Sequence, residues 1–544
     1  MSNHTERFHG RALLAAALAV LLIIGSLTHL ERAASGLDIE ALQIDATPVT
    51  VFRAQSGHRL AADSEAPVVL IAHGFAGSQQ LMHPLATTLA HGGFTVITFD
   101  FPGHGRNVAP MRGGLADADA SLRTLLASME AMGRHAVQRA GPRGRYALIG
   151  HSMASDIVVR HAQAHPEVEA TVALSLFAPS IQAQTPADSP RNLLVINGAL
   201  EPQVMAAEAL RVLAAGRADA ASASSAFSTT YGDFSRGTAR RAMLAPGVEH
   251  IGVLYSAATL AATLDWLNQA FDRSAVTAAV IDERGLWLGL LVVGVVLLAW
   301  PLSLGLSRLG SFAGADHPSV HDRLLPQRWF GWGGVLVPVV APAILTPMIL
   351  RPIPTNFLPI LLGDYLMMHF ALYGALTALG LALAGRLQRP TLASSLAKGL
   401  FVRRAACLLL VCAYALLALG LPLDRYAFNL WPEPARLPLV LALLAGTLPW
   451  FLADEWLTRR RGAPRGAYLA SKVAFLGSLV VAIALDPQRL FFLMIIVPLI
   501  LILFVIHGLY SRWLARATSQ PAMAAVANAV VFAWFIAVTF PLVA

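Results

Sequence analysis

Charged residues and cysteine are both scarce in this chain of 544 residues. Only 13% of its residues are charged, 56% are hydrophobic, and the mean hydropathy is +0.60. Because soluble globular domains carry about 25% charged residues, a purely soluble protein is excluded. The two cysteines, Cys407 and Cys412, lie in one apolar run, so no disulfide framework stabilises the rest of the chain.

Several apolar runs are long enough to cross a bilayer, which takes about 20 residues. One run lies near the N-terminus at 12–30, and it could be either an anchor or a cleaved signal peptide. No small-residue cleavage site follows it directly, so an uncleaved anchor is preferred. The other candidates are 286–306, 332–350, 357–385, 405–423, 437–452, 468–485, 490–509 and 522–542.

The charges are distributed unevenly along the chain. Residues 31–283 contain 18 Arg and 23 Asp or Glu, a net charge of −5, although the whole chain carries +8. The basic excess therefore belongs to the apolar remainder and does not indicate nucleic-acid binding. It gathers in alternate short loops, which the positive-inside rule places in the cytoplasm. These loops contain Arg308, Arg323, Arg328, Arg386, Arg389, Lys398, Arg403, Arg404, Arg459, Arg460, Arg461, Arg465, Arg512 and Arg516.

This pattern predicts four parts in a multi-pass protein of the cell (inner) membrane. Residues 1–11 form a cytoplasmic N-terminus and 12–30 a transmembrane anchor. Residues 31–285 form a domain on the extracytoplasmic, or periplasmic, side. Residues 286–544 form an all-α membrane domain with about eight transmembrane helices.

The extracytoplasmic domain contains a serine in the setting of a nucleophile elbow. Gly150-His151-Ser152-Met153-Ala154 follows the apolar run 146–149 and precedes a helix-like stretch at 155–164. Strand, sharp turn and helix in this order hold a serine hydroxyl out toward a base. Small flanking residues are needed because the two backbones come close, and Ala154 stands where glycine is more usual.

A glycine-rich loop follows an upstream buried-strand run at 67–72. It reads His73-Gly74-Phe75-Ala76-Gly77-Ser78, and such a loop can aim backbone N–H groups at a developing oxyanion. We assign the oxyanion hole to the N–H groups of Phe75 and Met153; the alternative is an ordinary tight turn. Asp100 and His104, in a Pro-Gly turn after the strand at 94–100, are interpreted as structural.

Two further candidates follow the serine along the chain. Glu201 comes just after the apolar strand 193–196, where a carboxylate can orient a histidine, with Asp188 and Asp233 as rivals. His250 lies on a loop after the strand-like 242–244 and would take the proton of Ser152. The catalytic prediction is therefore Ser152, Glu201 and His250, in that order.

Residues from about 45 to 273 resemble the α/β-hydrolase superfamily, near its dienelactone-hydrolase-like and serine-aminopeptidase-like branches. The matching segments are HGFAGS, FDFPGHG, GHSMA, the strand before Glu201, and VEH. The resemblance implies a mostly parallel sheet with flanking helices, and hydrolysis through an acyl-enzyme. The connection between the strands at 170–177 and 193–196 is short, which leaves little room for a helical cap.

The expected function is a membrane-embedded serine hydrolase that cleaves a carboxylic ester, with a lipid or lipid-linked ester as one possibility and a peptidase not excluded. The alternatives are a transporter or scaffold with a regulatory hydrolase-like domain, and an acyltransferase. The expected partners are a small-molecule or lipid ester and membrane lipids, without nucleic acid. His73, His104, His151 and His250 lack metal-ligand spacing on a shared element, so neither metal nor cofactor is predicted.

A polar side chain inside an apolar run costs free energy when it is placed in the membrane, so such residues mark candidate sites. Asp364 is one, and its structural interpretation is a partnership with a group such as Arg351. His369 follows five residues later and points about 140° away on a helix, so the two are not expected to share a site. Asp454 and Glu455 are interpreted as boundary charges beside Arg459 and Arg460.

Overall fold

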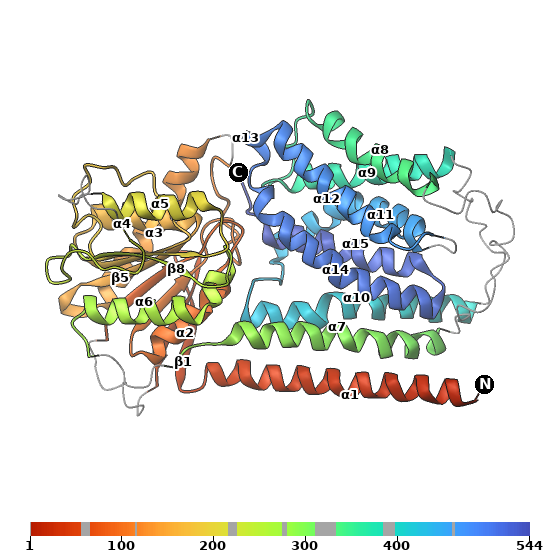
Figure 1. The fold of residues 1–544 in the computed structure, drawn as a ribbon, viewed down its shortest axis with the longest axis horizontal. Helices are drawn as coiled ribbons and strands as arrows, with labels where there is room; N and C mark the ends of the chain where they lie inside the picture. Colours follow the sequence, from red (N-terminus) through yellow and green to blue (C-terminus); the bar gives the residue numbers. More distant parts are fainter. Residues whose placement is uncertain are drawn as a thin grey trace. The chain divides into compact units, whose positions relative to one another are not determined.

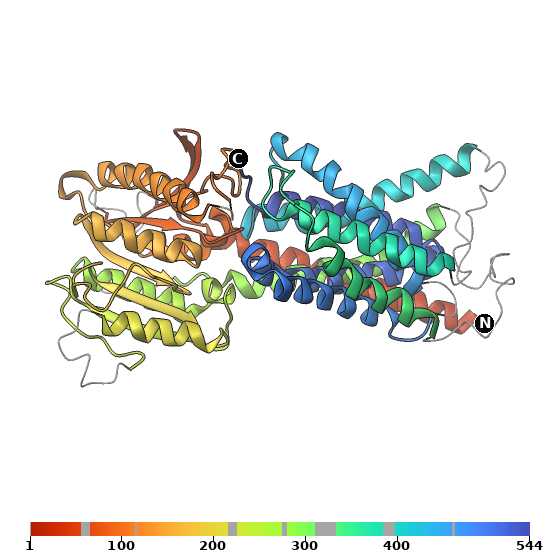
Figure 2. The same ribbon diagram turned by 90° about the horizontal axis from the view of Figure 1, so that it is seen from above.

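The computed structural model describes residues 2–55, 66–114, 117–215, 226–274, 280–310, 333–383, 398–459 and 463–544. The chain divides into two compact units (Figures 1 and 2). The sheet unit contains residues 26–289 together with 422–430 and 541–544. The helical unit contains residues 1–25, 290–421 and 431–540. Each unit is described by itself.

The sheet unit is built on eight strands in the order β1-β2-β4-β3-β5-β6-β7-β8. β1 pairs antiparallel with β2, and β2 antiparallel with β4; all other neighbours are parallel. The parallel strands are continuous buried apolar runs, as expected for a sheet covered on both faces. The strands are β1(Leu37–Ile44), β2(Thr47–Ala54), β3(Val68–Ala72), β4(Thr95–Phe99), β5(Tyr146–His151), β6(Val168–Leu174), β7(Leu193–Gly198) and β8(Arg240–Ala245).

Helices cover both faces of this sheet (Figure 1). On one face α2(His83–His91) and α6(Ala257–Ala270) bury leucines against Val69, Ile71 and Ile149. On the other, α4(Met153–Ala164) and α5(Gln203–Ala214) pack on Ala173 and Val195, and α3(Ala118–Arg139) packs against α4. The predicted α/β class with a mostly parallel sheet is confirmed. Residues 175–192, between β6 and β7, contain no helix, in keeping with the short connection expected there.

The helical unit and the segments that lead into it contain long apolar helices. Eight of the described helices are long and apolar enough to cross a membrane, whereas the described apolar part of α8 spans only Val335–Leu350. Three prolines interrupt α8. The helices are α1(Ser2–Ala33), α7(Arg284–Leu309), α8(Gly333–Leu350), α9(Gly363–Leu383), α10(Lys398–Tyr426), α11(Leu437–Arg459), α12(Ala467–Leu485), α13(Pro487–Leu490), α14(Leu493–Thr518) and α15(Pro521–Thr539).

Close helix packing in this unit depends on glycine. A Cβ on Gly374 of α9 would lie 2.5 Å from the backbone nitrogen of Trp450, and one on Gly446 of α11 would lie 2.3 Å from the carbonyl oxygen of Met367. Small residues at such crossings let two backbones approach, which is how apolar helices gain packing energy in a membrane.

The structural interpretation of Asp364 fits the structure, but its partner is not Arg351. Asp364 lies in the first turn of α9, and its carboxylate accepts from the backbone N–H groups of Phe357 and Tyr365. It caps the orphan amides that every helix start leaves.

Asp454 and Glu455 lie near the end of α11, and Glu455 Oε2 is 3.6 Å from Arg459 Nε, as expected for charges beside these arginines. Both acids are nevertheless only 1% exposed, and Asp454 forms an ion pair with Lys472 of α12, which was not expected.

Candidate active site

Ser152 occupies the turn between β5 and α4 with a backbone that few side chains adopt. Its φ is 53° and its ψ is −115°, a strained combination for a residue with a Cβ. The turn brings the flanking backbones so close that only glycine fits at position 150: a Cβ there would lie 2.5 Å from the carbonyl oxygen of Ala154. The predicted nucleophile elbow is thus present as a strand-turn-helix unit.

The structure brings the three predicted site residues together from distant parts of the chain. Ser152 Oγ donates to His250 Nε2 over 2.9 Å, and His250 Nδ1 donates to Glu201 Oε1 over 2.6 Å. These residues follow β5, β7 and β8, whose carboxyl ends meet at one edge of a parallel sheet. Of the rival acids, Asp233 caps its own turn through the N–H of Ser235, and neither Asp233 nor Asp188 bonds to His250.

The Glu201 carboxylate is held by groups that the sequence alone did not identify. Its Oε2 accepts from the backbone N–H of Gly198 over 2.6 Å and from Ser175 Oγ over 3.0 Å. The Glu201 side chain is 1% exposed, whereas that of His250 is 30% exposed. The acid is therefore sheltered from water, while the imidazole remains open to an incoming molecule. A polar residue directly after β6 was the signal available for Ser175.

His151, next to the serine, holds the backbone of His250. Its Nε2–H donates to the His250 carbonyl oxygen over 2.9 Å. Burial lowers the pKa of His151 to about 3, with the charge of His250 adding to the effect, so its imidazole is neutral. On the other side of His250, the Glu249 carboxylate accepts from the N–H groups of Ile251 and Gly252 and caps the following helical turn. His151 and Glu249 therefore both help to fix the backbone around His250.

The predicted oxyanion loop runs directly beside the elbow. A Cβ on Gly74 would lie 3.0 Å from Ser152 Cβ and 3.0 Å from His151 Nδ1, so only glycine fits there without movement. The Phe75 amide follows Gly74 in this loop. Met153 begins α4, so its N–H is among those with no acceptor inside the helix.

Asp100, His73 and His104 hold the surrounding loops. Asp100 Oδ1 accepts from the Gln79 N–H over 2.8 Å and Oδ2 from the Arg106 N–H over 3.1 Å. His73 Nε2 accepts from the Phe101 N–H over 3.1 Å, and His104 Nδ1 donates to the Pro102 carbonyl over 2.9 Å. Burial raises the pKa of Asp100 and lowers that of His73. These contacts fit the structural interpretation of Asp100 and His104.

Residues 63–229 match the family described as serine aminopeptidase, S33 (Hydrolase_4). The N-terminal half of the chain is an α/β-hydrolase domain. The matched range includes Ser152 and Glu201 and ends before His250. Many long apolar helices follow this hydrolase domain, which suggests a multi-pass membrane protein.

Three solved structures that are similar to this chain each cover less than half of it. A predicted CIB-like hydrolase from Thermoplasma acidophilum is 16% identical, with 42% of this chain and 97% of that chain covered and a TM-score of 0.30. A protein from Thermus thermophilus is 17% identical (44% and 99% covered, TM-score 0.33). A membrane phospholipase A, described as a bacterial virulence factor, is 15% identical (49% and 99%, TM-score 0.29). No curated protein matches the chain.

Proposed function

We propose that this protein is a membrane-embedded serine hydrolase that cleaves a carboxylic ester at the outer face of the cytoplasmic membrane. One observation carries the proposal: an unbroken hydrogen-bond chain from the Ser152 hydroxyl through His250 to Glu201. Donation from His250 Nδ1 to Glu201 leaves the Nε2 lone pair facing the serine. This is the arrangement that a general base needs.

The proposed reaction has two halves. Ser152 Oγ attacks the acyl carbonyl while its proton moves to His250 Nε2, and the N–H groups of Phe75 and Met153 stabilise the oxyanion. The imidazolium returns the proton to the leaving alcohol, which departs and leaves an acyl-enzyme. Water then gives up a proton to His250 and attacks the acyl group, and Ser152 leaves with that proton. Glu201 steadies the charge on His250 in both halves.

Esters are preferred over amides because an amine leaving group demands more of the acid step. A lipid or lipid-linked ester is the preferred class because two apolar helices flank the domain at short range. Only residues 34–36 separate α1 from β1, and α7 begins at Arg284, soon after α6 ends at Ala270. Such tethers keep the serine close to the bilayer surface.

The proposed orientation is supported by two later segments of the chain that belong to the sheet unit, and by the number of helices between them. The α10–α11 connection belongs to this unit, where the N–H of Asn429 donates to Ser78 Oγ over 3.1 Å. So does the end of the chain, where the N–H of Leu542 donates to the Gly103 carbonyl over 2.9 Å. Four helices separate α7's start from the first contact and four long helices separate the two contacts. An even number of helices in each set must cross for both segments to lie on one side. We propose that all four in each set cross, α8 included, and the arginine-rich loops then face the cytoplasm.

The test of the activity is covalent labelling. Full-length protein in detergent is treated with a fluorophosphonate probe and assayed with short-chain p-nitrophenyl esters. We expect Ser152→Ala to lose both labelling and turnover, and Ser128→Ala on α3 to keep both. Absence of labelling in a folded wild-type sample would overturn the proposal.

The test of orientation uses an impermeant maleimide on intact cells, after Cys407 and Cys412 are replaced by serine. Asp119→Cys lies on the exposed start of α3, and Arg516→Cys on the exposed end of α14. Labelling at 119 and protection at 516 are expected. The reverse pattern would contradict the outward placement of the hydrolase domain.

A transport function of the helical unit is a second candidate, favoured by its buried charges. Asp454 and Glu455 of α11 and Lys472 of α12 are each at most 3% exposed. Ionisable groups at such positions commonly mark a substrate or ion path. A deletion strain complemented with Ser152→Ala or with Glu455→Gln, at matched protein levels, separates the two functions. Failure of Glu455→Gln with intact labelling would favour transport.

A further inference from the structure

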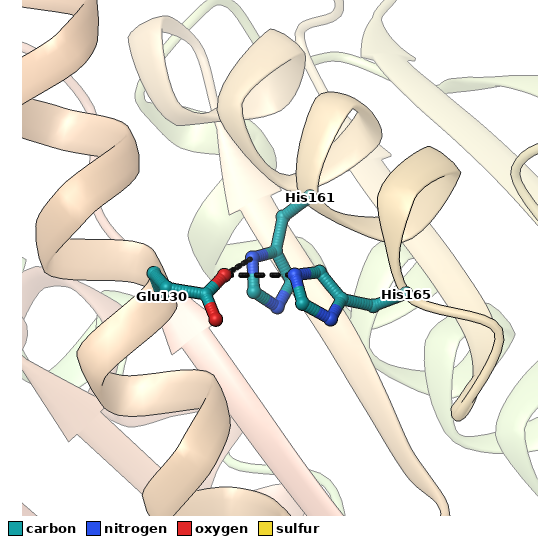
Figure 3. Close-up of side chains that lie close together, drawn as sticks. All are labelled: Glu130, His161 and His165. Atoms are coloured by element: carbon teal, nitrogen blue, oxygen red, sulfur yellow. Dashed lines mark hydrogen bonds and ion pairs between the residues drawn. The ribbon is translucent and has the colours of Figure 1, made fainter.

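We propose that Glu130, His161 and His165 form a binding site for one zinc-class divalent metal ion, on the hydrolase domain but away from Ser152. One ligand atom of each side chain lies within 4.8 Å of the others. Figure 3 shows the Glu130 carboxylate reaching from α3 toward two imidazoles at the end of α4. The proposal does not depend on the activity of Ser152.

The donor atoms are spaced as a small tetrahedral ion requires. Glu130 Oε2 lies 2.7 Å from His165 Nε2 and 3.6 Å from His161 Nδ1. Zinc bonds of about 2.0–2.1 Å place tetrahedral donors about 3.4 Å apart, between these two distances. His161 lies in the last turn of α4 and His165 directly follows the helix, with ring centroids 4.1 Å apart and planes 22° apart.

Each imidazole has a partner for its other nitrogen. His165 Nδ1 lies 3.1 Å from Glu167 Oε1, and His161 Nε2 lies 2.7 Å from the Tyr146 hydroxyl. Metal-bound histidines almost always donate their second N–H to such acceptors, which fixes the tautomer. Here that tautomer turns one lone pair of each ring toward Glu130.

The helix opposite the histidines leaves room for them. A Cβ on Gly133 of α3 would lie 2.7 Å from His161 Nε2 and 3.0 Å from the Tyr146 hydroxyl. Glycine inside a helix costs about 1 kcal/mol relative to alanine, yet only glycine admits the ring here. Glu130 stands three residues earlier, on the same face of α3. One helix therefore supplies both the space and the carboxylate.

The competing description is a proton in place of a metal. A protonated His165 would bridge Glu130 and Glu167 without any ion. Arg134 is the other charge at Glu130, with Nη1 3.6 Å from Oε1, an exposed pair that leaves Oε2 to the histidines. In that description His161 Nδ1–H points at Glu130 Oε2, and His161 Nε2 accepts from the Tyr146 hydroxyl. A metal ion instead takes one lone pair from each of the three side chains, and a metal titration distinguishes the two descriptions.

The site has a structural role in this proposal. His165 follows Ser152 by 13 residues, which at 1.5 Å per helical residue is about 20 Å. A metal there cannot act on the ester, but it ties α3 to the end of α4, the helix that Ser152 begins. An ion that binds only the folded state stabilises it by mass action. The i,i+4 histidine pair is the sequence signal for this site, whereas the prediction of no metal rested only on His73, His104, His151 and His250.

The test is a metal titration of full-length protein in detergent after chelator treatment. We expect wild type to bind one equivalent of Zn²⁺ with Kd below about 10 µM, and Co²⁺ to give the visible bands of tetrahedral coordination. Glu130→Gln and His165→Ala should weaken this binding by at least about 100-fold, since even outer partners of metal ligands cost 10–100-fold. His135→Gln, on α3 but outside the cluster, is the matched control and should bind as wild type does. Fluorescence-detected size exclusion of the chelator-treated variants reports whether each one is folded.

X-ray absorption at the zinc edge of wild-type protein tests the ligands without any variant. Two imidazoles with oxygen ligands are expected. The proposal is overturned if wild type binds no equivalent with Kd below about 10 µM, if His165→Ala binds as tightly as wild type, or if the shell contains sulfur or a single imidazole. None of these results bears on the Ser152 chemistry, so the two proposals fail separately.

Discussion

Glu201 Oε1 lies 2.6 Å from His250 Nδ1, and the other oxygen of the same carboxylate is bound by Gly198 and Ser175. The carboxylate is therefore fixed at one end and aims at the imidazole with the other. The carboxylate is linked to Ser152 through the imidazole of His250. A change at Glu201 should accordingly act on the base and not on the nucleophile itself.

Glu201→Gln should lower kcat for p-nitrophenyl esters by about 10³–10⁴-fold, because an amide neither stabilises an imidazolium nor fixes its tautomer. Folding and slow fluorophosphonate labelling should survive. Asp188→Asn, an exposed carboxylate in the same domain, is the control and should leave kcat unchanged. Retention of more than about a tenth of the activity by Glu201→Gln would remove Glu201 from the proposed triad.

The buried imidazole of His151 should make the stability of the fold fall at acid pH. Its pKa is lowered by burial from 6.5 to about 3, so between these values the unfolded chain binds a proton that the folded chain excludes. Stability therefore falls as pH drops from 6.5 toward 3, by up to about 1.4 kcal/mol per pH unit from this group. His73 and His250 are its titratable neighbours. Thermal unfolding from pH 7.5 to 5 should show a shallower pH dependence for His151→Gln than for wild type. Parallel curves for the two proteins would contradict the prediction.

Gly150→Ala should destabilise the hydrolase domain and abolish labelling of Ser152. The new Cβ would lie 2.5 Å from the Ala154 carbonyl oxygen and 2.7 Å from Val158 Cγ2, and overpacking of this kind costs about 1–3 kcal/mol. Ala154→Gly is the matched control, because it only adds helix flexibility worth about 1 kcal/mol. Thermal unfolding and probe labelling measure both effects. Equal stability of Gly150→Ala and wild type would mean that strand and helix can separate at the elbow.

The site residues that directly follow a strand could be predicted from the sequence. Ser152, Glu201 and His250 each come just after an apolar run, and parallel strands deliver such residues to one edge. Ser175 and the His151–His250 bond were not predictable in the same way. They depend on which strand lies beside which, and that order is not a local property of the sequence.

The apolar runs predicted the long helices of the helical unit but not the partners of the charges within them. Asp454 sits near the end of a run and beside arginines, so it resembled a boundary residue. Its actual partner, Lys472, lies 18 positions later on the next helix. Pairing across helices depends on how they pack, and neither hydropathy nor charge counts contain that information. Asp364 has the expected structural role, but its partners are backbone amides, which the sequence does not display.

Removing either partner of the buried ion pair between Lys472 of α12 and Asp454 should strongly destabilise the helical unit. The Lys472 ammonium group pairs with Asp454 and lies 4.4 Å from the ring centre of Trp450 and 4.3 Å from that of Tyr468. Lys472→Met or Asp454→Asn alone leaves one buried charge without its partner, which costs about 3–5 kcal/mol. Each single variant should therefore unfold at lower temperature in detergent.

The double variant Asp454→Asn with Lys472→Met should recover much of that loss, since it removes both buried charges together. Arg512→Gln, an exposed cation on α14, is the control for loss of positive charge and should unfold like wild type. Melting temperatures followed by fluorescence-detected size exclusion compare the four variants with wild type. A double variant no more stable than the weaker single variant would show that the two charges do not depend on each other, and would direct the search to Glu455 and Arg459, which lie 3.6 Å apart on α11.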